Sequence, residues 1–67
     1  AVGHYQAAIK FDPKNALAHN NLGVAYSRLG KRDLAEAEYR QALKLKPDYR
    51  EAEQNLQALK LGPGARQ

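Results

Sequence analysis

The residues best able to bind a metal or move a proton in this sequence are two histidines, His4 and His19. They do not stand at the i,i+3 or i,i+4 spacing that would place two ligands on one helix face, and no cysteine is present to complete a zinc site. Ser27 has no histidine or acid at the spacing of an activated nucleophile. We therefore expect no catalytic residue, no metal site and no cofactor, and no enzyme activity from this chain by itself.

The carboxylates and glycines lead to the same expectation. Glu36 and Glu38 fall on different faces of a helix, so we interpret both as solvated surface residues. Glu36 and Arg40 form an i,i+4 pair, which adds about 0.3 kcal/mol to a helix. The glycines are solitary or lie in the tail, so no glycine-rich phosphate loop is expected.

Length and composition favour a small helical domain. A chain of 67 residues forms one domain of marginal stability, and without cysteine no disulfide can reinforce it. No apolar run approaches the roughly 20 residues that span a bilayer, so no membrane contact is expected. The lack of cysteine is consistent with a reducing compartment and favours the cytoplasm.

The chain repeats itself with a period of about 34 residues, a length typical of helical repeat arrays. At this offset identical residues coincide repeatedly, and eight of the pairs lie within residues 1–56. These eight are Ala1 with Ala35, Tyr5 with Tyr39, Ala8 with Ala42, Lys10 with Lys44, Pro13 with Pro47, Ala18 with Ala52, Asn21 with Asn55 and Leu22 with Leu56.

The repeated stretch resembles a tetratricopeptide repeat (TPR). The resemblance covers about residues 1–61 and rests on seven positions in the order and spacing that the family uses. These are Leu22, Gly23, Tyr26, Ala35, Tyr39, Ala42 and Pro47. His19 departs from the pattern, because the family prefers tryptophan there; we expect it to pack partly buried in the tryptophan position, with His4 at the surface.

Apolar periodicity and breakers predict an all-α fold, made of antiparallel helical hairpins of an α-solenoid. Four helices are expected, at residues 2–11, 16–29, 33–45 and 49–61. By the register of the repeat, 1–15 is the second helix of a truncated repeat, 16–49 a complete repeat, 50–61 a C-terminal capping helix and 62–67 a flexible tail.

Particular residues should set the helix ends and the closest helix contact. Asn15 is a predicted N-cap, Asp33 a predicted cap of the third helix, and Gly30 suits a left-handed residue at a helix end. Glycine inside a helix costs about 1 kcal/mol relative to alanine. Gly23 therefore needs a reason, and we predict a close approach of the next helix, with Ala35 as the residue that meets it.

The two end helices differ in their outer faces. In residues 49–61, polar side chains stand where the preceding repeat has its packing residues: Glu53, Gln57 and Lys60 replace His19, Gly23 and Tyr26. The other face keeps Ala52, Asn55, Leu56 and Leu59, so this helix is expected to end an array, and Gly62-Pro63-Gly64 to stop it. In residues 2–11 the apolar positions are Val2, Tyr5, Ala8, Ile9 and Phe11. Val2, Tyr5 and Ile9 are expected to lack a partner helix and to offer a surface for self-association.

In the family, the first helix of each repeat lines a concave groove. Carried over by position, the resemblance implies a peptide-binding groove formed by Asn20, Asn21, Val24, Ser27, Arg28, Glu51, Gln54 and Asn55, flanked by Leu17 and Ala58. Asn21 and Asn55 stand one repeat apart, and an asparagine amide both donates and accepts hydrogen bonds. The pair resembles the asparagine ladder of the superhelical TPR array in O-linked N-acetylglucosamine transferase. Alternatively, each asparagine bonds only a neighbouring backbone group or helix end.

Two other partner classes are less well supported by the sequence. Chaperone-adaptor TPRs grip a C-terminal carboxylate with Lys and Arg, whereas Glu51 and Asn55 occupy those positions here. Basic residues could favour RNA, as in pentatricopeptide arrays, but no exposed aromatics are interleaved with them, so nucleic acid is not an expected partner. The basic set is Lys10, Lys31, Arg32, Arg40, Lys44 and Lys46.

Together these features predict a protein–protein interaction module that binds a peptide or partner protein in the concave groove, at the C-terminal end of a longer array. Two alternatives stay open. The chain could be a self-associating assembly scaffold, or the substrate-recruiting arm of a larger enzyme such as a glycosyltransferase.

Overall fold

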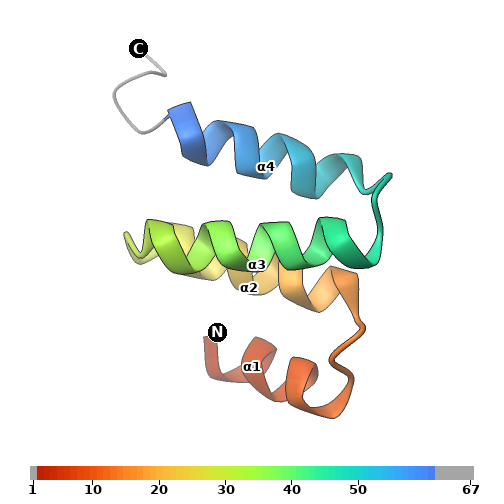
Figure 1. Ribbon diagram of the computed structural model, residues 1–67. Coiled ribbons are helices and arrows are strands. Elements are labelled where there is room, and N and C mark those ends of the chain that lie inside the picture. Colours follow the sequence, from red (N-terminus) through yellow and green to blue (C-terminus); the bar gives the residue numbers. More distant parts are fainter. Residues whose placement is uncertain (1, 62–67) are drawn as a thin grey trace.

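The computed structural model describes residues 2–61, and this part of the chain consists of helices joined by short loops (Figure 1). The helices are α1 (Val2–Phe11), α2 (Ala16–Arg28), α3 (Arg32–Leu45) and α4 (Arg50–Leu61). The predicted all-α fold is confirmed, and each predicted helix exists with ends within a residue of those observed. The expected stop at 62–64 and the expected flexible tail at 62–67 lie outside the described residues.

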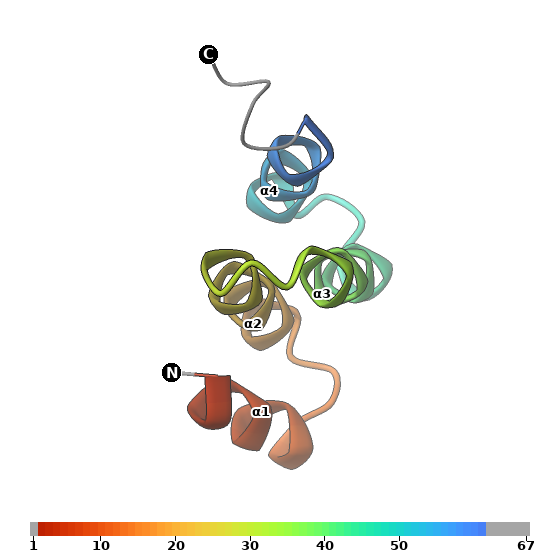
Figure 2. The same ribbon diagram turned by 90° about the vertical axis from the view of Figure 1, so that its left-hand side faces the viewer.

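The helices stack in chain order, from α1 at one end of the molecule to α4 at the other (Figure 2). Between these ends α2 and α3 lie side by side as an antiparallel hairpin, and α4 packs on α3 and touches α2. Because the loops are only a few residues long, helices that follow one another in the chain must run antiparallel. This arrangement brings α2 into contact with every other helix.

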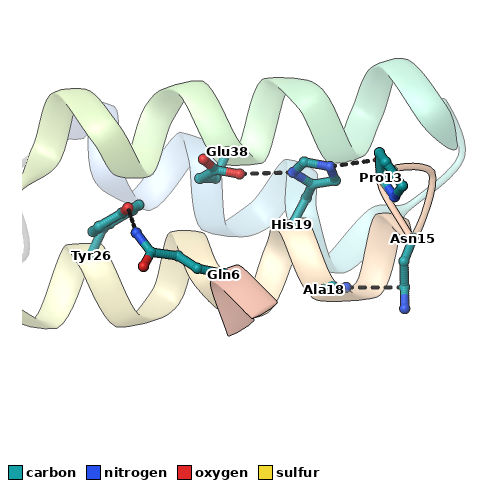
Figure 3. Close-up of polar contacts among 7 residues, drawn as sticks. All are labelled: Gln6, Pro13, Asn15, Ala18, His19, Tyr26 and Glu38. Atoms are coloured by element: carbon teal, nitrogen blue, oxygen red, sulfur yellow. Dashed lines mark hydrogen bonds and ion pairs between the residues drawn. The ribbon is translucent and has the colours of Figure 1, made fainter. Parts of the chain in front are cut away.

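Local sequence determines both ends of α2. The Asn15 side chain accepts a hydrogen bond of 3.1 Å from the amide of Ala18, which confirms Asn15 as the N-cap (Figure 3). At the other end Gly30 has φ +80°, and the Lys31 amide bonds the Tyr26 carbonyl at 2.9 Å. That pattern closes a helix with a left-handed residue, for which glycine carries no steric penalty.

The predicted cap of α3 was wrong. The helix begins at Arg32, and the N-cap is Lys31, which makes no side-chain capping bond. Asp33 lies one residue into the helix, in its first turn, where its charge interacts favourably with the positive end of the helix dipole. The helix begins one residue earlier than predicted, and its first backbone hydrogen bond runs from the Ala35 amide to the Lys31 carbonyl at 3.0 Å.

The closest helix contact joins Gly23 of α2 to the ring of Tyr39 in α3. A Cβ atom built on Gly23 would lie 2.6 Å from Cε1 and 2.7 Å from Cδ1 of that ring. Real Cβ atoms essentially never lie within 3.0 Å of such a neighbouring heavy atom, so any side chain at this position would force the Tyr39 ring to shift. The prediction of a close approach is confirmed. The three atoms nearest that Cβ all belong to Tyr39, and Ala35, the partner expected from the sequence, is fully buried in the same core.

A small apolar core surrounds this contact. Its buried members are Leu22, Tyr26, Ala35 and Tyr39, and the packed flanking residues are Val2, Tyr5, Ile9, Val24, Leu56 and Leu59. Ala42 and Ala52 are also fully buried, because an alanine lets the backbones of neighbouring helices approach closely. Six of the seven residues that carry the TPR resemblance are therefore inside; Pro47 is exposed in the α3–α4 loop.

The apolar residues of α1 do not form the free patch that the sequence suggested. Val2, Tyr5 and Ile9 are half-buried and pack against the core cluster around α2, so each already has a partner helix. Gln6 adds a hydrogen bond of 2.9 Å from its side-chain amide to the Tyr26 hydroxyl (Figure 3). Phe11, which was assigned to the apolar face, is the last residue of α1 and is 92% exposed.

In α4 one face is packed against the rest of the protein and the other is exposed, as the sequence indicated. Ala52 is buried, and Asn55, Leu56 and Leu59 are half-buried. The side chains of Glu53, Gln57 and Lys60 are exposed. The buried face is anchored further by Arg32, whose guanidinium donates to the Leu59 carbonyl at 2.6 Å.

Burial of Tyr39 predicts a loss of stability at alkaline pH. Desolvation raises the pKa of the Tyr39 phenol above its usual 10.0, so above pH 10 the unfolded chain holds fewer protons than the folded one. The unfolding free energy then falls as pH rises. The pKa of Tyr49 is also raised, by desolvation and by the negative charge of Glu51, while a hydrogen bond with Asn20 acts in the opposite direction and lowers it.

Thermal unfolding of wild type and Tyr39→Phe at pH 8 and at pH 11 measures this effect. The loss in melting temperature between the two pH values should be smaller in Tyr39→Phe, because that variant lacks the contribution of the Tyr39 phenol. Equal losses in both proteins would contradict the assignment to Tyr39.

Candidate functional site

His19 is buried at the junction of α2, α3 and the α1–α2 loop, where both ring nitrogens have partners (Figure 3). Nδ1 lies 2.8 Å from Oε1 of Glu38, and Nε2 lies 2.9 Å from the carbonyl oxygen of Pro13. Because the Pro13 carbonyl and the Glu38 carboxylate both only accept, His19 donates both hydrogen bonds when each ring nitrogen carries a proton. His19 therefore fills the position where the family prefers tryptophan, and it adds polar links to two neighbouring elements.

Glu38 corrects the interpretation of the carboxylates. Its side chain is 23% exposed and pairs with His19, so it is a helix-linking residue and not a solvated one. Helical spacing alone could not show this, because the partner comes from another helix. Glu36 instead pairs with Arg40 on the surface of α3, as predicted.

Asn20 does not belong to an open groove. It is only 3% exposed, and its side-chain oxygen accepts a hydrogen bond of 3.0 Å from Nδ2 of Asn55. This bond joins α2 to α4. It involves one amide hydrogen of Asn55, so the Asn55 side-chain oxygen and the second amide hydrogen do not take part in it. The structure therefore gives Asn20 and Asn55 a side-chain link between helices, which neither alternative for the asparagines had included, and Asn21 takes no part in it.

The remaining predicted groove residues are accessible. Asn21 and Val24 are half-buried on α2, and Asn55 is half-buried on α4. The side chains of Ser27, Arg28, Glu51 and Gln54 are exposed. Leu17 is 56% exposed at the start of the α2 row. The surface thus combines amide groups, one cation and one carboxylate with small apolar patches.

A separate groove lies between α1 and α2. It has a volume of about 550 Å³, and more of its wall is apolar than polar. The lining residues are Val2, Gly3 and Tyr5 of α1 with Asn21, Val24, Ala25, Arg28 and Leu29 of α2. Sequence reasoning placed Asn21, Val24 and Arg28 on a binding surface, but it gave no signal that they share a groove with α1.

Half of the basic residues that favoured RNA already have partners within the fold. Arg32 bonds the Leu59 carbonyl, Arg40 pairs with Glu36, and the Lys46 ammonium lies 5.2 Å from the centre of the Tyr49 ring. These contacts intersperse the positive charges with acids and carbonyls.

Within residues 2–61, no cluster of three or more histidine or acidic side chains could hold a metal ion. The same stretch contains no helix with the length and apolarity to cross a membrane. Among the described residues, two surfaces contain predicted binding residues: the α2–α4 row of side chains and the groove between α1 and α2.

Comparison with known proteins agrees with the class of protein that this geometry defines. The tetratricopeptide repeat family model matches residues 16–49, and a second family model, described as TPR repeat, matches residues 1–30. The chain belongs to the tetratricopeptide repeat family, whose repeats are in general protein-interaction modules.

A relative of known description is the Protein O-mannosyl-transferase F38B6.6 of Caenorhabditis elegans. It is 41% identical over 59 residues, which is 88% of this chain. The chain spans only 9% of the length of that relative. The similarity therefore concerns a helical segment of a much longer protein.

Proposed function

We propose that this chain binds an extended segment of a partner protein along the face formed by α2 and α4, and that it has no catalytic role itself. Membership of the TPR family is the observation that carries the proposal. Asn21 provides an amide on α2, and Asn55 provides another on α4. Amides of this kind bind a peptide backbone whatever its side chains are, because each backbone unit has one donor and one acceptor.

The hydrogen bond between Asn20 and Asn55 supports this arrangement. It restricts the Asn55 side chain to one orientation, which lowers the entropy that a ligand must overcome when it binds. Exposed Ser27 and Gln54 add hydrogen-bonding groups near the two amides. Glu51 and Arg28 add charges of opposite sign, so the surface is suited to a polar peptide more than to an anion.

Substitution of Asn21 tests the proposal. Peptides selected from a random library by binding to the wild-type chain should bind Asn21→Ala about three- to tenfold more weakly, the effect of one lost hydrogen bond. Isothermal titration calorimetry measures the difference. Asn21 is the better choice than Asn55, because Asn55→Ala would also leave the buried Asn20 without its partner.

Gln41→Ala is the matched control, since it removes an exposed amide from α3 on another part of the surface. It should bind the selected peptides as the wild type does. Equal affinities of Asn21→Ala and wild type, or a selection that yields no binder, would refute the proposed function.

A second candidate is a substrate-recruiting arm of a larger enzyme. The observation in its favour is the similarity to the O-mannosyl-transferase, of which this chain matches a small part. In that case the surface along α2 and α4 would hold the protein that the enzyme modifies. Fusion of the chain to an unrelated catalytic domain would then raise modification of peptides that carry a selected binding sequence.

We further propose that α4 ends the array of repeats, because Glu53, Gln57 and Lys60 leave its outer face polar. Self-association through α1 stays a prediction. The inward packing of Val2, Tyr5 and Ile9 reduces the apolar surface that α1 could contribute to it.

A further inference from the structure

The two hydrogen bonds of His19 require a proton on each ring nitrogen. Oε1 of Glu38 lies 2.8 Å from Nδ1 and the Pro13 carbonyl oxygen lies 2.9 Å from Nε2, and a carboxylate and a carbonyl both only accept. A neutral imidazole has a single N–H. Both bonds therefore exist only when the His19–Glu38 pair holds one proton more than a neutral ring beside a carboxylate.

Loss of that proton breaks one of the two bonds in preference to the other. The remaining proton is held best on Nδ1, because a hydrogen bond to a charged carboxylate is roughly twice as strong as one to a neutral carbonyl. Nε2 then presents its lone pair to the Pro13 oxygen, and two acceptors repel each other. His19 is only 7% exposed, so little water reaches the ring to replace the lost bond.

Glu38 is the charged group that lies against the ring. The other charged side chains on the elements around His19 are exposed, so solvent and salt weaken their effect on it. They are Lys10 of α1, Asp12 and Lys14 of the α1–α2 loop, Arg28 of α2, Arg40 and Lys44 of α3, and Arg50, Glu51 and Glu53 of α4. Tyr39 and Tyr49 do not change charge near neutral pH, because the pKa of each is raised above 10.0.

The Pro13 bond matters for α1, the helix that the rest of the fold holds least. α1 has no buried residue. Its contacts with the core come from half-buried side chains and from the hydrogen bond between Gln6 and the Tyr26 hydroxyl. The Pro13 carbonyl fixes the loop that follows α1 to the His19 ring (Figure 3). Without this bond, the loop and α1 can turn away from the α2–α3 hairpin together.

We propose that His19 and Glu38 form a proton-dependent latch that holds α1 on the α2–α3 hairpin. With the additional proton, the ring joins the Glu38 carboxylate to the Pro13 carbonyl and the latch is closed. Without it, the ring keeps its bond to Glu38 and releases the loop, so α1 opens more often. The closed chain binds one proton more than the open chain, so a rise in pH favours opening. Imidazole changes charge between about pH 5 and 8, which gives the range in which the latch acts.

The latch also controls the groove between α1 and α2. Val2, Gly3 and Tyr5 of α1 form one wall of this groove, and opening of α1 removes that wall. The α2–α4 face contains no residue of α1, so the latch acts whether or not a peptide binds there.

Hydrogen exchange of the α1 backbone amides, followed by NMR, measures the latch. The whole chain is prepared with an acetylated N-terminus, because a free α-amino group titrates at about pH 8. Protection factors, corrected for the intrinsic effect of pH on exchange, are compared at pH 5.5 and at pH 8. Those of residues 6–11 should fall about five- to tenfold between the two pH values, the effect of one lost hydrogen bond.

Glu38→Gln removes the dependence on the additional proton. A glutamine amide donates to an unprotonated Nδ1 while the neutral ring keeps its Nε2–H on Pro13, so both bonds exist at either pH. The protection of α1 in Glu38→Gln should therefore be the same at pH 5.5 and at pH 8. His4→Gln is the matched control, because it removes the exposed histidine of α1 and should keep the wild-type fall.

The ring nitrogens of the wild-type chain give an independent measurement that needs no variant. Long-range proton–nitrogen NMR spectra should show His19 protonated on both nitrogens at pH 5.5 and on Nδ1 alone at pH 8. Three results would each overturn the proposal: equal protection of α1 at the two pH values in the wild type, a wild-type fall in Glu38→Gln, or a proton on Nε2 of His19 at pH 8.

Discussion

Gly23→Val should leave the chain unfolded at 25 °C. The first carbon of the new side chain would lie 2.6 Å from Tyr39 Cε1. Tyr39 is only 3% exposed, so the surrounding core prevents its ring from shifting away. One overpacked atom costs about 1–3 kcal/mol, and valine adds two further methyl groups to the clash. A domain of this size gains only about 3–5 kcal/mol from its core, so the loss removes most of its stability. Circular dichroism at 222 nm measures the helix content.

A pair of alanine substitutions separates this contact from helix propensity. Gly3→Ala and Gly23→Ala make the same change within a helix. The intrinsic gain is up to about 1 kcal/mol in the interior of α2 and smaller at Gly3, which lies in the first turn of α1. No atom lies within 4 Å of a Cβ placed on Gly3. Gly3→Ala should therefore raise the melting temperature and Gly23→Ala should lower it. A rise in both would show that the α2–α3 approach is looser than described.

His19→Ala should lower the unfolding free energy by about 2–3 kcal/mol. The change removes links to Glu38 and Pro13 and leaves a half-buried carboxylate without its partner. Breaking a fully buried pair costs about 3–5 kcal/mol, and Glu38 is 23% exposed, so solvent reduces the penalty. At about 4–8 °C per kcal/mol, the melting temperature should fall by at least 8 °C.

A double-mutant cycle tests whether the pair is responsible. His19→Ala and Glu38→Ala should together cost less than the sum of the single changes, with a coupling of about 0.5–3 kcal/mol. Glu36→Ala is the matched control, because its partner Arg40 is 62% exposed and such pairs contribute about 0–1 kcal/mol. Strict additivity of His19→Ala and Glu38→Ala would exclude a direct interaction.

The sequence predicted the features that depend on local or periodic signals. Proline breakers, the Asn15 cap and the positive φ at Gly30 act within a few residues, so a linear pattern contains them. The period of about 34 residues predicted the class of fold for the same reason. Gly23 could be recognised as a close-contact site, because glycine inside a helix is costly without one.

Apart from the cap of α3, a local feature, the errors concern contacts between helices. Which residue of α3 faces Gly23 depends on the rotation of α3 about its axis, and this rotation places Tyr39 there. The Asn20–Asn55 bond and the His19–Glu38 pair each join side chains of different helices. The spacing of residues along the sequence does not show how far one helix is shifted along its axis relative to another, so neither pair could be predicted. Asn20 and Asn21 are neighbours in sequence, yet the helical turn buries one and leaves the other half-exposed.

The uneven distribution of buried residues has a consequence for motion. Six residues of α2 and three of α3 are buried, whereas α4 buries Ala52 alone and α1 buries none. Local opening should therefore begin at the outer helices, and the central hairpin should exchange its amide hydrogens last. The proposed binding surface joins α4 to α2. A ligand on it would suppress the opening of α4, and the chain would become more rigid when it is bound.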